Sequence, residues 1–187
     1  GFIGTSLKKD EYVGECADID DVIVFMEDGK MIITKVESKT FVGKNIIHAA
    51  VFKKNDNRTV YNLVYRDGKN GPSYIKRFSV TGITRDKVYD LTNGSDQSKI
   101  LYFSANPNGE AETITVLLRA LQRVKKIKWD VDFADILIKG RNSKGNLISK
   151  FPVKKIELKV KGISTLKPRK IWFDNTVQRL NVDQRGD

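Results

Sequence analysis

The stretch VIVFMEDGKMIITKV, residues 22–36, decides the fold. A run of apolar, mostly β-branched residues reaches Asp28-Gly29, and a second such run follows. Asp-Gly supplies the positive φ angles of a two-residue turn, so the stretch predicts a β-hairpin. Ile23 and Val24 point to opposite faces of the first strand and both are apolar. We therefore expect this sheet to be covered on both sides.

The same strand–turn–strand pattern recurs along the chain. It is found in residues 60–80, 99–118, 136–153 and 170–182, and the turn glycines 29, 68, 109 and 145 are 39, 41 and 36 residues apart. Any all-β protein has frequent turns, but the shared order of apolar run, Gly or Asn turn and apolar run indicates a true repeat. Repeats of this length are typical of propellers. We therefore predict an all-β, propeller-like disc of four to five small antiparallel blades, in a single domain of residues 1–187.

Two segments give weaker signals. In residues 74–78, the alternation of Lys76 and Arg77 with apolar neighbours predicts a wetter sheet edge. Residues 112–129 carry Leu117, Leu121, Val124 and Ile127 at helical spacing, but the Thr-Ile-Thr-Val near their start is β-branched. We expect a strand over residues 113–119 and leave 120–128 open between helix and strand.

The composition predicts a folded protein of a reducing cytoplasm. Apolar residues make up 40% and charged residues 30% of the 187 residues, which favours folding over disorder. No run approaches the roughly 20 apolar residues of a membrane span, and no secretory signal is visible. The only cysteine, Cys16, excludes an internal disulfide. Because the sequence begins with Gly1 and not Met, we expect a fragment of a longer protein.

Positive charge gathers in the second half of the chain. Residues 1–93 hold 15 basic and 13 acidic residues, whereas residues 94–187 hold 19 and 10. Residues 136–170 contain eleven basic residues and a single acidic residue, Glu157. Such a one-signed surface favours a polyanionic partner. The predicted DNA-binding residues are Arg119, Arg123, Lys125, Lys126, Lys128, Lys139, Arg141, Lys144, Lys150, Lys154, Lys155, Lys159, Lys161, Lys167, Arg169 and Lys170.

The residue types further indicate how nucleic acid would be bound. Lysine dominates these stretches and is a point charge suited to phosphates, while Asn and Gln, which read base edges, are few. A single-strand binder needs exposed aromatic side chains. Trp129, Phe151, Trp172 and Phe173 lie in or beside predicted strands, where we expect them to belong to the core. The sequence therefore predicts binding to the backbone of double-stranded DNA with little sequence preference.

Three other hypotheses are weaker. Cys16 and His48 could form a nucleophilic pair, but the acidic residues around Cys16 disfavour its thiolate. Asp18, Asp20 and Asp21 could hold a metal ion, although such acidic runs are more often exposed loops. The dipeptide Trp129-Asp130 is typical of propeller repeats that serve as protein-interaction scaffolds, but it occurs once.

Two parts of the sequence resemble a known family. GFIGTSLKKDEYV with DDVIVFMEDGKMIITKV (residues 1–13 and 20–36), and ADILIKGRNSKGNLISKFPVKKI (residues 134–156), resemble repeats of the C-terminal domain of the A subunits of bacterial type IIA topoisomerases, gyrase and topoisomerase IV. The resemblance implies a β-pinwheel, a disc whose blades exchange strands, with DNA bent around its basic outer rim. It also implies that the domain presents DNA to a catalytic core.

The resemblance implies that other parts of the parent enzyme carry out the catalytic steps. The partners would be the N-terminal breakage-reunion region of the same polypeptide, together with the separate ATPase chain. ATP and magnesium would act there, with no cofactor in this domain. The cleaving tyrosine would lie in that N-terminal region. No catalytic role is therefore expected for Tyr12, Tyr61, Tyr65, Tyr74, Tyr89 or Tyr102.

The sequence departs from the gyrase pattern at one motif. Gyrases carry a Gln-Xaa-Arg-Gly-Gly-type box in this domain, and the nearest fragment here is Gln184-Arg185-Gly186 at the C-terminus. The resemblance therefore favours topoisomerase IV over gyrase and puts strong DNA wrapping in doubt.

Overall fold

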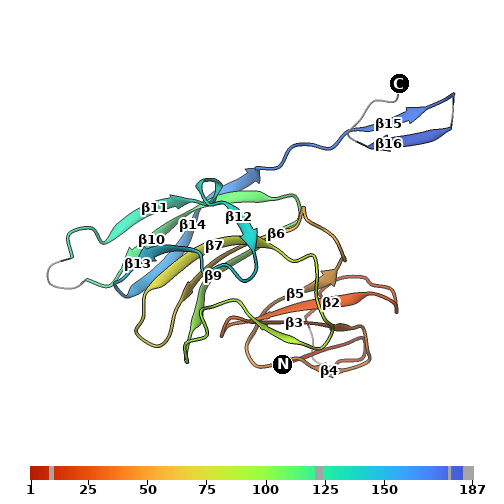
Figure 1. Ribbon diagram of the computed structural model, residues 1–187. Coiled ribbons are helices and arrows are strands. Elements are labelled where there is room, and N and C mark those ends of the chain that lie inside the picture. Colours follow the sequence, from red (N-terminus) through yellow and green to blue (C-terminus); the bar gives the residue numbers. More distant parts are fainter. Residues whose placement is uncertain (9–10, 121–123, 177, 183–187) are drawn as a thin grey trace.

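The computed structural model describes residues 1–8, 11–120, 124–176 and 178–182 (Figure 1). In these residues it consists of small β-sheets and one short 3-10 helix, η1 (Phe133–Asp135), which confirms the all-β prediction. None of the described residues forms a helix of the length and apolarity needed to cross a membrane.

The first sheet contains the hairpin expected over residues 22–36. Its order is β5 (Ile46–Phe52), β2 (Asp21–Met26), β3 (Lys30–Lys35) and β8 (Val88–Asp90). Strands β2 and β3 pair with Phe25 opposite Met31, and Gly29 forms the turn at a φ of 86°. Ile23 and Val24, on opposite faces, are both fully buried. The predicted hairpin and its two covered faces are confirmed.

The second sheet is built on the next predicted hairpin. Its order is β9 (Lys99–Asn106), β6 (Val60–Arg66) and β7 (Ser73–Ser79), and both β12 (Ile138–Gly140) and β13 (Asn146–Ser149) lie on the far side of β7. The predicted wet edge is wrong, because Lys76 and Arg77 are each only 2% exposed. Strand β7 has partners on both of its edges and packed side chains on both of its faces.

The third sheet has the order β11 (Lys128–Asp132), β10 (Glu110–Leu118) and β14 (Val153–Ser164). The strand expected over residues 113–119 is confirmed as far as Leu118. The described part of the 120–128 segment is a loop up to the start of β11. Two smaller sheets each have two strands: β1 (Phe2–Ile3) with β4 (Thr40–Phe41), and β15 (Ile171–Asp174) with β16 (Arg179–Val182).

Two of the predicted hairpins are wrong in their pairing. Strands β9 and β10 flank the turn at Gly109 but belong to different sheets, so this turn carries the chain from one sheet to the next. Strands β12 and β13 flank Gly145, yet both pair with β7 rather than with each other. A turn signal specifies a reversal of the chain, but the strand that each arm joins depends on packing far away in sequence.

The pairings follow a regular order. After the hairpin β2–β3, the chain returns through β4 to pair with β1, and after β6–β7 it returns through β8 to pair with β3. After β10–β11 it returns through β13 to pair with β7. The next strand then joins its own hairpin, as β5 joins β2, β9 joins β6 and β14 joins β10. Each unit therefore supplies one strand to the preceding sheet, which links consecutive sheets covalently.

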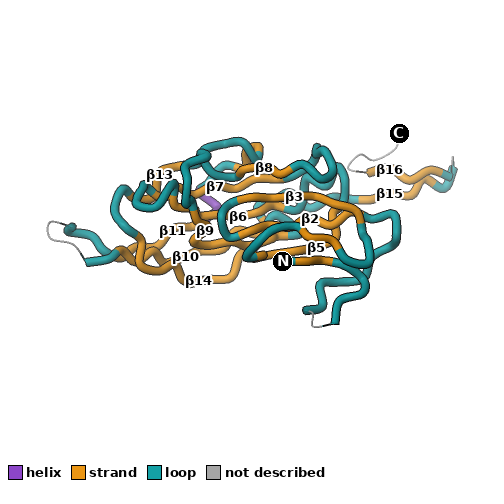
Figure 2. The backbone as a smooth tube through the Cα atoms, turned by 90° about the horizontal axis from the view of Figure 1, so that it is seen from below, coloured by secondary structure: helices purple, strands orange, loops and turns teal. Residues whose placement is uncertain are grey.

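Two apolar clusters join the three larger sheets into a row, which Figure 2 shows from below. Between the first and second sheets, the ring of Phe25 lies 4.7 Å from that of Tyr61 and 4.8 Å from that of Phe103, between centroids. On the other face of the second sheet, Val64 and Ile75 pack with β10. The second sheet is therefore the centre of the molecule.

A buried polar chain also ties the second sheet to the third. Arg77 Nε donates to Asn62 Oδ1 over 2.9 Å, and Asn62 Nδ2 donates to Glu112 Oε2 over 2.9 Å. Glu112 also accepts hydrogen bonds from the hydroxyls of Tyr102 and Ser104. Only 4% of Glu112 is exposed, so the carboxylate depends on these donors.

We predict that Glu112→Leu lowers the free energy of unfolding by about 3–5 kcal/mol, because Arg77 loses its buried counter-charge and three donors lose their acceptor. Urea unfolding followed by circular dichroism measures this loss. Glu157→Gln, at an exposed carboxylate, is the matched control and should leave the unfolding midpoint nearly unchanged. Equal midpoints for the two variants would contradict the structural role of the polar chain.

Candidate nucleic-acid interface

The row of sheets has two long edges. In the three larger sheets, we call the strands β8, β12 and β13, which pair with an earlier unit, the return edge. We call the strands β5, β9 and β14 the partner edge. In Figure 2, β8 and β13 lie along the top of the molecule, and β5 and β14 along the bottom. The predicted DNA-binding residues divide between these edges and the loops around the third sheet.

On the return edge, Arg141 and Lys144 lie on tyrosines that come much earlier in the chain. The guanidinium of Arg141 lies 4.5 Å from the ring centre of Tyr89, and Lys87 lies on the same ring at 5.3 Å. Arg141 Nη1 also donates to the Gly82 carbonyl over 2.7 Å. Lys144 lies 4.8 Å from the ring of Tyr74. The cationic surface therefore continues across the boundary between the first and second sheets.

A buried lysine supports this edge from below. Lys76 Nζ donates to the carbonyls of Arg141 and Ser143, over 2.8 and 2.9 Å. Burial lowers the pKa of Lys76 to about 8, and the nearby Asp90 opposes that shift. The two hydrogen bonds hold the loop that presents Arg141 and Lys144. This role was not predictable from the sequence, because a lysine that alternates with apolar residues in a strand does not indicate what its side chain contacts.

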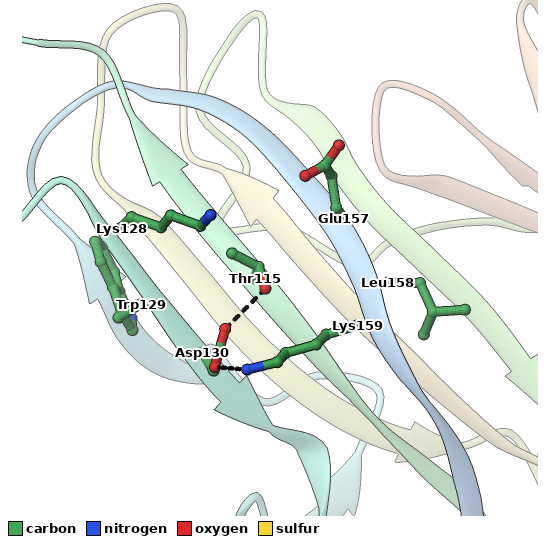
Figure 3. Close-up of a pocket in the computed structure, with 7 residues that line it drawn as sticks. All are labelled: Thr115, Lys128, Trp129, Asp130, Glu157, Leu158 and Lys159. Carbon is green, nitrogen blue, oxygen red and sulfur yellow. Dashed lines mark hydrogen bonds and ion pairs between the residues drawn. The ribbon is translucent and has the colours of Figure 1, made fainter.

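On the partner edge, the lysines of β14 are partly neutralised (Figure 3). Lys159 pairs with Asp130, which also accepts a 2.7 Å hydrogen bond from Thr115 Oγ1. Lys155 pairs with Glu157 over 2.5 Å. The hydrogen bonds from these lysines lower the pKa values of both carboxyl groups. Lys154 and Lys161, also on β14, are exposed.

The remaining predicted residues form two further groups. Arg119 lies beside the connection that holds Lys150, because its backbone N–H donates to the Pro152 carbonyl. It precedes the loop of Lys125 and Lys126, and Lys128 begins β11. Lys167, Arg169 and Lys170 follow β14 and are exposed. Lys139 is exposed on β12, and Arg123 lies outside the described residues, as does the fragment Gln184-Arg185-Gly186. The structure thus brings these residues together in separate groups along the row.

The expectation for the aromatic residues is wrong at three of four positions. Trp129 packs against the second apolar cluster, as expected. Phe151, Phe173 and Trp172 are instead 48%, 54% and 38% exposed. Phe151 lies in the connection between β13 and β14, whereas Trp172 and Phe173 lie on β15, which pairs only with β16 in the described part of the chain. Tyr74, Tyr89 and Lys87, which join the return edge, were not in the predicted set.

The residues of the weaker hypotheses have other roles. Cys16 is exposed, whereas the half-buried His48 packs between the rings of Phe25 and Phe103. Asp20 accepts from the Ala17 N–H, and Asp21 pairs with Arg85. Among the described residues, no three Asp, Glu, His or Cys side chains are grouped so that they could hold a metal ion.

Comparisons with known proteins agree with the resemblance seen in the sequence. A family model described as "Topoisomerase C-terminal domain, Bacteroidota" matches residues 1–161. The chain is 29% identical over 160 residues to the A subunit of DNA topoisomerase 4 from Borreliella burgdorferi, in an alignment that covers 85% of this chain and 24% of that protein. The chain therefore spans about a quarter of the length of that relative.

A solved structure also matches. It is described as the crystal structure of the C-terminal domain of DNA topoisomerase IV, with a TM-score of 0.46 and 10% sequence identity. The match covers 76% of this chain and 47% of that one.

We predict that Lys76 makes the free energy of unfolding rise with pH. The folded protein releases the Lys76 proton at about pH 8, whereas the unfolded chain holds it to a pH near 10.5. Between these values the unfolded state binds more protons, so raising the pH favours the folded state. From about pH 7.5 to 9.5, the free energy of unfolding should rise by about 1–2 kcal/mol more for wild type than for Lys76→Met. Urea unfolding at several pH values measures this, and parallel pH profiles of the two proteins would refute it.

Proposed function

The chain belongs to the topoisomerase C-terminal domain family of Bacteroidota, and from this premise we propose that it binds double-stranded DNA without sequence specificity and bends it along a basic edge. The net charge of +11 and the concentration of basic residues after residue 94 support an anionic partner. The observation that carries the proposal is the contact of Arg141 with Tyr89 and Gly82, because it joins cations of successive sheets into one surface.

The regular exchange of strands supports a β-pinwheel as the architecture of this single domain. In such a disc each unit supplies a strand to its neighbour, as β8 and β13 do here. Units tied in this way form a rigid support, which bending requires, because curving a short duplex costs on the order of 1–6 kcal/mol. Lysine contacts with successive phosphates offset that cost and release bound counterions.

We assign the path of the DNA to the return edge rather than the partner edge. Lys155 and Lys159 on the partner edge already have carboxylate partners, which reduces the field that they present to a phosphate. Lys87, Lys139 and Lys144 on the return edge are exposed and form no ion pair with another described residue within 4 Å. Two of the four lysines of β14 are therefore compensated by carboxylates, whereas none of these three is compensated by a described carboxylate.

In the parent enzyme, the domain would capture a DNA segment and present it to the catalytic core. The parent would be an ATP-dependent type IIA topoisomerase, more similar to topoisomerase IV than to gyrase. Its breakage-reunion region and its separate ATPase chain would supply the chemistry, with ATP and magnesium, in the bacterial cytoplasm. The domain would act as an accessory DNA-binding part with no cofactor of its own.

The first test is the salt dependence of duplex binding. We expect the logarithm of the association constant to fall against the logarithm of salt concentration with a slope steeper than about −3, since each phosphate contact contributes roughly 0.9. Fluorescence anisotropy with two unrelated duplexes of equal length measures the slope and the sequence preference together. An affinity that does not change with salt would rule out the electrostatic mechanism.

The second test compares the two edges. The triple variant Lys87→Gln, Lys139→Gln and Lys144→Gln should reduce the magnitude of the slope by about 2–3 and weaken both duplexes alike. The double variant Lys155→Gln and Lys159→Gln is the matched comparison and should have a smaller effect per residue. A larger effect per residue on the partner edge would reverse our assignment, and loss on only one duplex would indicate base readout.

A further inference from the structure

Beyond β14, the chain forms a two-stranded ribbon that extends away from the row of sheets. Figures 1 and 2 both show β15 and β16 at the far right of the molecule. In the described part of the chain, these strands pair only with each other. An isolated two-stranded hairpin is at best marginally stable in water, so its apolar side chains need a partner. The family match ends at residue 161 and therefore assigns no role to this ribbon.

One face of the ribbon is apolar and open to solvent. Phe173 pairs with Leu180 across the two strands, and Ile171 lies two residues from Phe173 on the same face. Their exposed fractions are 54% for Phe173, 65% for Leu180 and 70% for Ile171. Trp172, on the opposite face, is 38% exposed. An exposed apolar face of this kind usually marks a binding surface.

The third sheet, which is nearest in sequence, carries ion pairs on the face that it turns to solvent. Its free face carries the Asp130–Lys159 ion pair (Figure 3) and the Lys155–Glu157 ion pair. Covering these charges with the apolar side chains of the ribbon would remove them from water without replacing their hydration. The other large sheets are joined mainly by apolar clusters, and the described residues in the ion-paired part of this face form no such cluster.

The root of the ribbon is fixed and strongly basic. Thr165 N–H donates to the Gly109 carbonyl over 3.1 Å, and Arg58 Nη1 donates to the Lys167 carbonyl over 3.1 Å. Residues 165–182 hold four basic residues against one acid, and three of the four, at positions 167, 169 and 170, come directly before β15. Charge complementarity therefore favours an anionic partner over a neutral protein surface.

We propose that the β15–β16 ribbon is a second DNA contact, an arm that lies in the major groove of the duplex bound by the return edge. This inference rests on the proposed function. Four residues of β-strand extend about 13 Å, and the major groove, about 12 Å wide, admits a two-stranded β-ribbon. The basic root contacts phosphates at the groove edge, while Ile171, Phe173 and Leu180 cover apolar surface of the groove without the base-edge hydrogen bonds that read sequence.

The two parts of the arm have different experimental signatures. Phe173→Ser with Leu180→Ser should weaken duplex binding about tenfold through lost apolar burial, with an unchanged salt slope. Lys167→Gln with Arg169→Gln and Lys170→Gln should instead reduce the magnitude of the slope by about 2–3. Ile163→Ser, at an apolar residue of β14 that is 80% exposed, is the matched control and should leave binding unchanged.

A direct readout uses the two tryptophans. In a Trp129→Phe background, Trp172 is the only indole, and its emission should change and become protected from iodide when a duplex is added. If wild type binds DNA but Trp172 and the Phe173/Leu180 variant show no change, the arm is refuted and the proposed function stands. If wild type fails to bind duplex at low salt, the proposed function itself fails. The Phe173→Ser and Leu180→Ser variant could also keep its DNA affinity but sediment at a lower mass than wild type. That result would show that the apolar face binds a second copy of the chain, which also overturns the proposal.

Discussion

The structure depends on one constraint: the second sheet buries large apolar side chains on both of its faces, so it can fold only between two other sheets. Leu63 and Val64 are neighbours on β6, point to opposite faces and are both fully buried. Leu63 belongs to the apolar cluster shared with the first sheet, and Val64 to the cluster shared with the third. A sheet with one polar face could stand at an end of the row, but this one cannot. The pairing of β8 with β3 and of β13 with β7 supports the same arrangement, because each pairing ties together two sheets whose apolar faces pack on each other.

The two buried cations of β7, Arg77 and Lys76, stabilise this arrangement by hydrogen bonds on opposite faces of the second sheet. Arg77 faces the third sheet, where Asn62 and the carbonyls of Gly109 and Glu110 accept its hydrogen bonds. Lys76 faces the opposite side and holds the loop that carries Arg141. Ordered polar contacts such as these fix position more narrowly than apolar packing, since a displaced donor loses its acceptor. The core thereby determines where the cations of the return edge lie, although neither Lys76 nor Arg77 reaches the surface.

The sequence predicted local structure better than the joining of strands. The hairpins at Gly29 and Gly68 and the turn after Asp174 were predictable because a tight turn and its two strands are encoded within a short stretch of chain. The partners of β9, β12 and β13 were not, because those pairings span residues that are far apart in sequence. For the same reason, charge counting found Arg141 but could not show that it meets Tyr89. It also could not distinguish Lys159, which has a carboxylate partner, from lysines with none.

The two ends of the row differ in kind, and this difference bears on how DNA can follow it. At one end, Gly43 lies directly against Met26, so the chain around β1 and β4 closes over the apolar face of the first sheet. At the other end, the third sheet presents ion pairs that neither need nor favour an apolar cover. A repeat array ends where its outer face becomes polar, as the terminal units of such arrays must. A duplex that follows the return edge therefore leaves the row at the third sheet, and the basic root at Lys167 begins directly after the last strand of that sheet.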